Sequence, residues 1–172
     1  MYKRQIVNNS YTGLSLESSG VHDVFNNIIW NNGKRNDGSG ANYRAVNVAS
    51  LGNFTSDYNC IQEQSGANTI YVGYVGAMSW QQWRKYQSGV FDAHSTTNPP
   101  LFSGTGSSTD AGYYELSKDS AAVDVGLNEK SSEAKDFKGV PRISGLVIDL
   151  GALERLQSLT PVENLKILPT GP

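Results

Sequence analysis

The chain has 172 residues, which is enough for one domain with a modest hydrophobic core. It contains 18 Gly and 9 Tyr, and only 17% of its residues are charged, so turn-forming and strand-forming residues predict mostly β structure. The formal net charge of -2 argues against nucleic-acid binding, no apolar run reaches the length of a membrane span, and the single cysteine excludes an internal disulfide and a thiolate zinc site.

The first five residues, MYKRQ, resemble the translation of a transposase sequencing adapter with an initiator Met on a GTG codon. We therefore expect residues 1–5 not to be native, and the native sequence to begin at about Ile6 within a longer chain. A signal peptide would then have been lost together with the missing beginning.

Three segments share a strand-turn-strand pattern, in which apolar or β-branched residues lead to an Asn and then to further apolar residues. They are IVNNSYTGLSL from Ile6, VFNNIIWNNG from Val24 and TSDYNCIQ from Thr55. Superposing Asn9, Asn27 and Asn59 gives steps of 18 and 32 residues, and the second step contains the polar loop 31–44. A constant motif with irregular spacing predicts the coils of a solenoid over residues 6–62, with a loop inserted between them.

Elementary chemistry explains why Asn would recur at such bends. Asn adopts the left-handed backbone conformation at low cost, and its side chain can bond the backbone or the Asn of the next coil. The apolar residues that flank each bend would face inward, and stacked coils would bury them in one core. Cys60 is expected to be a small buried core residue of this kind.

The next segment begins with a strand in NTIYV and continues into one short helix around residues 79–88. Ser79 and Gln82 form a capping box that predicts its start. Trp80 and Trp83 lie three positions apart and therefore close together on the helix. We expect them to anchor the helix over the core, because large aromatic side chains dominate burial; stacking on sugar rings is the alternative.

Beyond the helix, turn and loop residues separate five short motifs that occur between residues 92 and 154. They are Asp92, His94 and Ser95; Pro100 and Phe102, with Pro99 in place of Asp; Ser120, Ala122, Val123, Asp124 and Gly126, with Ala121 in place of Pro; Gly139, Pro141 and Arg142; and Asp149, Gly151, Ala152 and Glu154, with Leu153 at an aromatic position. In this order they resemble the C-terminal closing region of bacterial right-handed parallel β-helix proteins of the choice-of-anchor Q type, in the pectate-lyase-like superfamily.

The resemblance implies an all-β fold, a right-handed parallel β-helix represented by its C-terminal coils and a cap. Residues 63–154 would be the closing region, and residues 155–172 a linker or tail. The final DLGALE stretch would be a strand that closes the C-terminal end of the solenoid, because an open coil exposes apolar core and unpaired strand edges. The resemblance also implies a secreted or cell-surface protein that is monomeric when intact.

The closing motifs contain every residue type of a Ser-His-Asp site. We interpret them as structural residues that satisfy backbone groups at the cap, and the catalytic residues are left unknown. The residues interpreted in this way are Asp92, His94, Ser95, Asp124, Pro141, Arg142, Asp149, Gly151 and Glu154. Arg142 is expected to form a bidentate bond with Asp124 or Asp149.

The loop 31–44 is the part of the sequence most suggestive of surface function. Lys34, Arg35 and Arg44 could supply positive charge to an acidic polysaccharide, and Asp37 could help to hold a calcium ion. The alternative is that these charges are simply solvated, as in most Gly-rich loops. From the sequence of this chain we predict no metal site and no evident cofactor. Binding of Ca²⁺ is an expectation for the intact protein only.

Two functions follow from the resemblance. In the first, the intact protein binds or cleaves an acidic polysaccharide by a lyase-type reaction, and most of its catalytic coils lie outside this chain. In the second, it is a non-enzymatic surface adhesin or structural solenoid. A charged cluster on one sheet face favours the first, and an uninterrupted stack without such a cluster favours the second.

Overall fold

The computed structural model describes residues 4–17, 20–33, 44–63, 69–105, 107 and 109–156. Its strands are β1 Gln5–Val7, β2 Leu14–Leu16, β3 His22–Phe25, β4 Ile28–Trp30, β5 Val46–Val48, β6 Phe54–Asp57, β7 Cys60–Ile61, β8 Ile70–Val72 and β9 Gly76–Met78. The helix α1 spans Trp80–Lys85, and short 3-10 helices span Tyr86–Gly89, Ala111–Tyr114 and Asn128–Lys130. The predicted β-rich fold with one short helix is confirmed.

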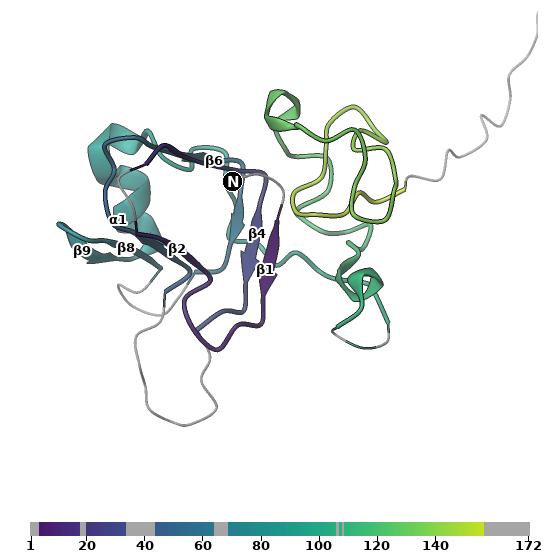
Figure 1. Cartoon of the computed structure of the whole chain (residues 1–172), viewed down its shortest axis with the longest axis horizontal. Helices are drawn as coiled ribbons and strands as arrows, with labels where there is room; N and C mark the ends of the chain where they lie inside the picture. Colours follow the sequence, from purple (N-terminus) through teal and green to yellow (C-terminus); the bar gives the residue numbers. More distant parts are fainter. Residues whose placement is uncertain are drawn as a thin grey trace, which may run out of the picture.

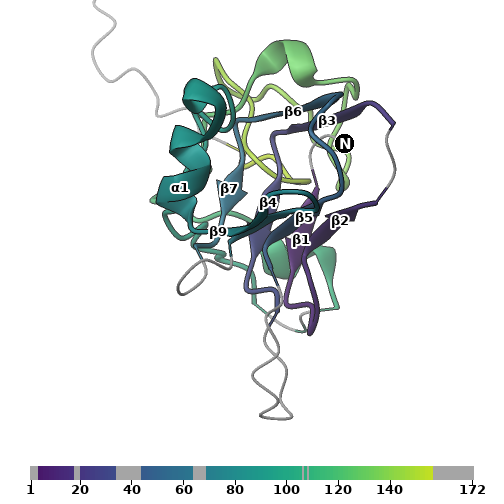
Figure 2. The ribbon, with the colours of Figure 1, turned by 90° about the vertical axis from the view of Figure 1, so that its left-hand side faces the viewer.

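The strands form three sheets, ordered β1-β4-β7, β2-β5-β8-β9 and β3-β6. The chain visits these sheets in a repeating sequence, β1, β2, β3, then β4, β5, β6, then β7, β8, so that each circuit lies beside the one before it (Figures 1 and 2). Neighbouring strands from successive circuits run parallel, and only the hairpin of β8 and β9 is antiparallel.

The space between the three sheets is filled by apolar side chains. Along β5, Val46 and Val48 are 3% and 0% exposed, whereas the intervening Asn47 points outward, which is the period of two expected of a strand. The buried residues of this core are Leu14, Val24, Ile29, Ala45, Val46, Val48, Leu51, Phe54, Ile61, Ile70, Val72, Met78, Trp83 and Phe91.

Side-chain amides connect successive circuits at the bend between two of the sheets. The backbone N–H of Asn27 donates to Asn59 Oδ1 at 3.0 Å, 32 residues later. The backbone N–H of Asn59 donates in turn to Ser95 Oγ at 2.8 Å, 36 residues later. In the first circuit the corresponding N–H belongs to Arg4, which donates to Asn27 Oδ1 over a step of 23 residues.

The predicted step of 18 residues is therefore wrong. Asn9 does not stack on Asn27; its backbone N–H donates to Asn32 Oδ1 at 3.1 Å, 23 residues later. The register of β1 against β4, with Val7 beside Trp30, fixes the same step. The predicted step of 32 residues from Asn27 to Asn59 is confirmed.

The helix α1 covers the C-terminal end of the sheets (Figure 2). It begins as predicted, since Ser79 Oγ accepts from Gln82 N and Gln82 Oε1 accepts from Ser79 N. Trp83 is 1% exposed and packs in the core against Phe54 and Phe91, with ring centroids 6.1 and 4.8 Å away. The predicted anchoring role of this tryptophan is confirmed, because its ring is buried and out of reach of a surface ligand.

The described residues between 97 and 156, here called the C-terminal segment, lie against the outer face of the sheet β1-β4-β7 (Figure 1). Ile28 and Ile29 are both 0% exposed because this sheet is buried on both faces. Ile28 and Cys60 face outward into a second core, which they form together with Leu116, Ala122 and Leu150. The outward apolar residues of the sheet thus require a cover, and the C-terminal segment provides it.

The DLGALE stretch differs from its prediction in two respects. The structure assigns it no strand, and it lies beside the sheet β1-β4-β7, whereas α1 occupies the end that it was expected to close. Its backbone joins the bend before β4, since Gly151 N donates to Asn26 O at 2.8 Å. Gly151 has a φ of +90°, and a Cβ there would lie 2.8 Å from Ile28 Cδ1. Glycine is therefore required for this close approach.

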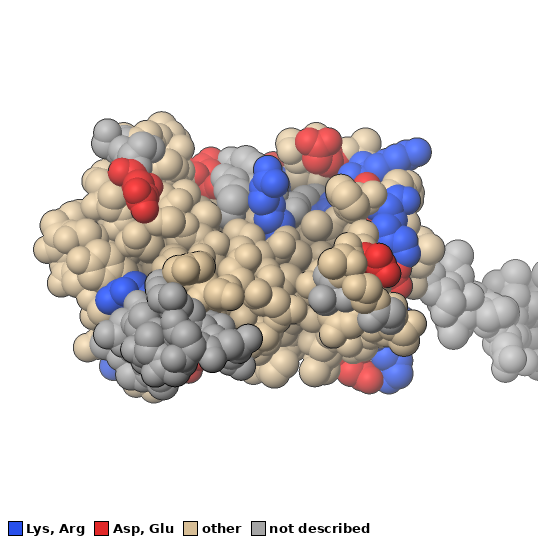
Figure 3. All heavy atoms as spheres, turned by 60° about the horizontal axis from the view of Figure 1, so that its bottom comes forward, with Lys and Arg blue, Asp and Glu red and all other residues tan. Residues whose placement is uncertain are grey.

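Charged side chains are unevenly distributed over the surface. On the face in Figure 3 they gather mainly over the C-terminal segment, and the visible described residues of the three sheets include few of them. Among the described residues, no helix combines the length and apolar character needed to cross a membrane.

Candidate functional site

Asp92 is a buried carboxylate, 1% exposed, at the point where the chain returns from α1 to the sheets. Its Oδ1 accepts from Ser56 Oγ at 2.9 Å, Ser95 Oγ at 2.6 Å and Asn59 Nδ2 at 3.2 Å. Its Oδ2 accepts from Trp83 Nε1 at 2.8 Å. Burial raises the pKa of Asp92, and the four donors act in the opposite direction. These contacts join α1 to two neighbouring circuits.

His94 lies in a different environment from Asp92 and Ser95. Its Nδ1 is 2.7 Å from Asp57 Oδ2, its backbone N–H donates to Asp57 Oδ1 at 2.6 Å, and its ring stacks on Tyr58 with centroids 4.7 Å apart. Ser95 directs its hydroxyl to Asp92 and is not part of this pair. The motif Asp-x-His-Ser therefore contributes to two separate polar clusters and forms no Ser-His-Asp arrangement.

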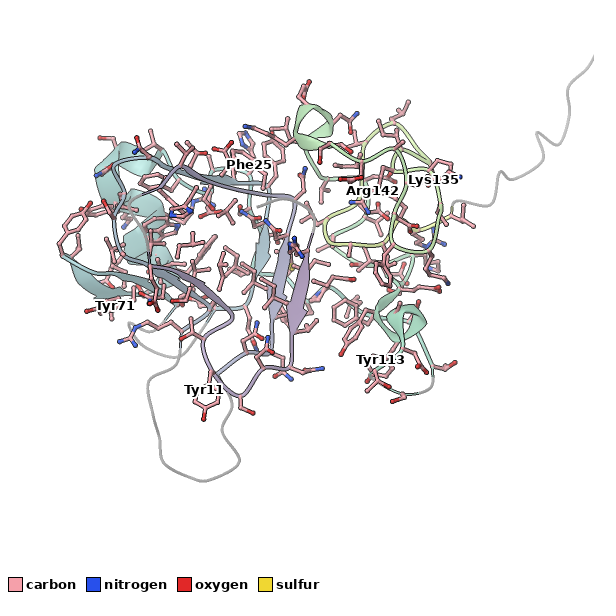
Figure 4. All side chains as sticks on the ribbon, viewed as in Figure 1. Tyr11, Phe25, Tyr71, Tyr113, Lys135 and Arg142 are labelled. Atoms are coloured by element: carbon pink, nitrogen blue, oxygen red, sulfur yellow. The ribbon has the colours of Figure 1, made fainter. Side chains whose placement is uncertain are left out.

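The remaining closing motifs meet in the interior of the C-terminal segment, where Figure 4 shows Arg142. Asp149 accepts backbone N–H groups, from Asp124 at 2.8 Å and from Arg155 at 2.7 Å. The carboxylate of Glu154 accepts from Asp149 N at 3.2 and 3.3 Å. Burial raises the pKa of Asp149. Each carboxylate thus satisfies backbone donors in a region with little regular structure.

The ion pair of Arg142 differs from its prediction. Its Nε lies 3.5 Å from Glu154 Oε1, and its Nη2 donates to Gly151 O at 2.9 Å, so the carboxylate that it contacts belongs to Glu154 and not to Asp124 or Asp149. The Asp149 carboxylate already accepts from the backbone N–H groups of Asp124 and Arg155, while the Glu154 carboxylate lies beside the guanidinium. Burial lowers the pKa of Arg142. Pro141 is exposed and lies in an isolated antiparallel bridge with Lys135.

Of the four residues predicted to bind substrate, Lys34, Arg35 and Asp37 lie outside the described residues. Arg44 is described, and its guanidinium lies 4.5 Å from the centroid of the Tyr71 ring. Among the described residues, no group of three His, Cys, Asp or Glu is arranged to hold a metal ion.

Tyr71 belongs to a row of outward side chains on the sheet β2-β5-β8, here called the outer row. Ser15, Asn47 and Tyr71 are in register on neighbouring strands. Asn47 and Tyr71 have a buried residue on either side, and Ser15 lies between the buried Leu14 and the partly buried Leu16. Asn47 Nδ2 donates to Ser15 Oγ at 3.0 Å. Neighbouring strands are about 4.8 Å apart, so the row presents a polar or aromatic group at that interval. Arg44, two residues before β5, lies beside Tyr71 of this row.

A groove of about 370 Å³ lies between the C-terminal segment and the sheet β1-β4. Trp30, Phe102 and Tyr113 contribute aromatic rings to its lining, and Asn8 and Asn31 contribute amides. Figure 4 shows Tyr71 on β8 and Tyr113 on the C-terminal segment, at opposite sides of the molecule. The groove and the outer row are therefore separate surfaces.

Sequence reasoning missed this groove because Trp30 and Tyr113 are far apart in the chain. The motif NPPLF supplied one wall, but nothing local indicated that it would face β4. Comparisons of the chain with protein-family models, with curated proteins and with solved structures found no match.

Proposed function

We propose that this chain forms the C-terminal coils of a right-handed parallel β-helix of the choice-of-anchor Q type, within a secreted or cell-surface bacterial protein. Three observations support the proposal: the repeated visits to three sheets, the parallel pairing of successive circuits, and the side-chain bonds that join Asn27 to Asn59 and Asn59 to Ser95. Such a stack buries a continuous core that no single coil could bury alone.

The proposed activity is binding of an acidic polysaccharide along the outer row. The observation that carries it is the alignment of Ser15, Asn47 and Tyr71, with Arg44 beside Tyr71. A guanidinium can bind a uronate carboxylate through two parallel hydrogen bonds, and the Tyr ring offers an apolar face to a sugar ring. Evenly spaced polar groups suit a ligand that is itself a regular chain.

We assign binding, and not cleavage, to the described part of the chain. Elimination beside a uronate carboxylate needs a base and stabilisation of the developing charge at one place. The motif residues Asp92, Ser95 and Asp149 are buried or engaged in internal bonds away from the outer row. Cleavage, with Ca²⁺ as an aid, is a proposal for other coils of an intact protein, and an adhesin would need only the binding face.

The test is calorimetric titration of the full chain with a galacturonic acid hexamer. Arg44→Gln is expected to weaken binding about tenfold at low salt and less at high salt, because screening reduces the charge contribution. Arg84→Gln is the matched control, since Arg84 also lies over an aromatic ring, 5.7 Å from the Trp80 centroid, but on α1. Equal affinities of both variants and the wild type would refute the outer-row site.

Cleavage is tested separately by the rise in ultraviolet absorbance from the unsaturated uronate product, whose new C=C bond is conjugated to its carboxylate. We expect no increase with this chain. An increase that Arg44→Gln abolishes would show that the outer row is an active site and would replace the binding proposal.

A further inference from the structure

The groove beside β4 is held open by contacts between segments that are distant in the sequence. Gln5 Nε2 donates to Tyr114 O at 2.8 Å, across 109 residues, and fixes β1 against the 3-10 helix Ala111–Tyr114. The ring of Tyr114 packs edge-on against Phe102 and Tyr113, with centroids 5.4 and 5.1 Å away. The groove is therefore preformed by packed aromatic side chains, as small-ligand sites usually are.

The lining of the groove is uncharged. Its described residues are aromatic, aliphatic, proline, glycine or asparagine residues, with no Lys, Arg, Asp or Glu among them. An acidic ligand would gain no counter-charge from these residues, in contrast to the ligand proposed for the outer row. The volume of about 370 Å³ is near the lower end of the usual range for ligand sites, so the groove suits one or two sugar rings and not a long chain.

The amides at the groove present a paired donor and acceptor. Asn8 and Asn31 both adopt the left-handed conformation, with φ of 60° and 54°, and stack on successive circuits. Asn31 Nδ2 donates to Asn8 Oδ1 at 2.6 Å. Within the described residues, this leaves Asn8 Nδ2 as a donor and Asn31 Oδ1 as an acceptor without other bonds. A sugar hydroxyl both donates and accepts, so a pair of neighbouring hydroxyls matches the two amides.

We propose that this groove is a second binding site, specific for a neutral saccharide. The ring faces of Trp30 and Tyr113 receive the apolar faces of the sugar, and the amides of Asn8 and Asn31 bind its hydroxyls. The site goes beyond the acidic-polysaccharide function proposed above and does not depend on it, because the two surfaces share no residue.

The experiment is calorimetric titration of the full chain with glucan, xylan and mannan hexasaccharides, with a galacturonic acid hexamer and a proline decapeptide as comparison ligands. We expect at least one neutral hexasaccharide to bind. Tyr113→Ala should weaken that binding about tenfold, whereas Tyr113→Phe, which keeps the ring, should change it by less than about twofold. Tyr71→Ala is the matched control, and it should weaken only the acidic hexamer.

A second variant protects the test against misfolding. Asn8→Asp tolerates the left-handed backbone and still accepts from Asn31 Nδ2, but it loses the Nδ2 donor. It should weaken the neutral hexasaccharide without a change in melting temperature. The proposal is overturned if no neutral hexasaccharide binds, if both Tyr113→Ala and Asn8→Asp bind it at full strength, or if the proline peptide competes for the groove. If the wild-type chain binds a neutral hexasaccharide but not the galacturonic acid hexamer, the outer-row site is refuted and the groove site is supported.

Discussion

Replacing Asn59 by alanine tests whether the side-chain bonds between circuits stabilise the fold. Asn59 is 0% exposed; its Oδ1 accepts from Asn27 N at 3.0 Å and its Nδ2 donates to Val24 O at 2.8 Å. The Asn59→Ala variant would deprive both buried backbone groups of these partners. Each loss costs about 1–3 kcal/mol, so the free energy of unfolding should fall by about 2–6 kcal/mol. A domain of this size is stable by only about 5–15 kcal/mol.

Urea unfolding followed by tryptophan fluorescence measures the effect, because Trp83 lies in the adjoining core. Asn47→Ala is the matched control: the Asn47 side chain points outward and, among the described residues, bonds only Ser15 Oγ, so its loss should cost less than about 1 kcal/mol. If Asn59→Ala costs no more than Asn47→Ala, the buried bonds between circuits contribute no more than an exposed one, and our account of the stack is wrong.

Two further predictions concern buried titratable groups. Burial raises the pKa of Asp92 in the folded chain above its ordinary value of 3.8. At a pH between the ordinary pKa and the raised pKa, the folded chain binds more protons than the unfolded chain, so lowering the pH stabilises the fold through this group. The difference in unfolding free energy between wild type and Asp92→Asn should grow as the pH falls from neutral; a shrinking difference would mean that the anion is the favoured form. Burial also raises the pKa of Cys60 to about 12, and a disulfide reagent at pH 8 should modify this thiol only when urea unfolds the chain. Rapid modification of the folded chain would contradict its position in the second core.

The elements that could be predicted from the sequence depend on local interactions. The capping box of Ser79 and Gln82 lies within one helical turn, and β5 and β8 alternate buried and outward residues over three positions. The number of residues between equivalent positions of the first and second circuits could not be predicted in this way. The residue stacked beneath Asn27 needs only a backbone N–H to donate, and Arg4 meets that need as well as an Asn would. Matching one Asn to another therefore gave the wrong step.

The candidate sites depend on contacts that no local pattern encodes. Arg142 belongs to a motif that could be recognised, but its ion pair with Glu154 could not be predicted. The Asp149 carboxylate already accepts from the backbone N–H groups of Asp124 and Arg155, which no local pattern indicates. The groove needs Trp30 and Tyr113, which meet only because the C-terminal segment crosses the outer face of β4. Ile28 and Ile29 are both 0% exposed, but two adjacent buried residues do not identify the segment that covers the sheet.

The position of the C-terminal segment changes how the fold should come apart. A repetitive stack in which each coil touches only its neighbours can unravel one coil at a time from an end. Here the last part of the chain is fastened to the first coils: Asn26 Nδ2 donates to Leu127 O across 101 residues, and Lys130 pairs with Asp23 across 107 residues. The first circuit cannot detach as a whole without releasing these distant contacts. We therefore expect the described region to unfold in a single cooperative transition, and to refold slowly because long loops must close before these contacts form.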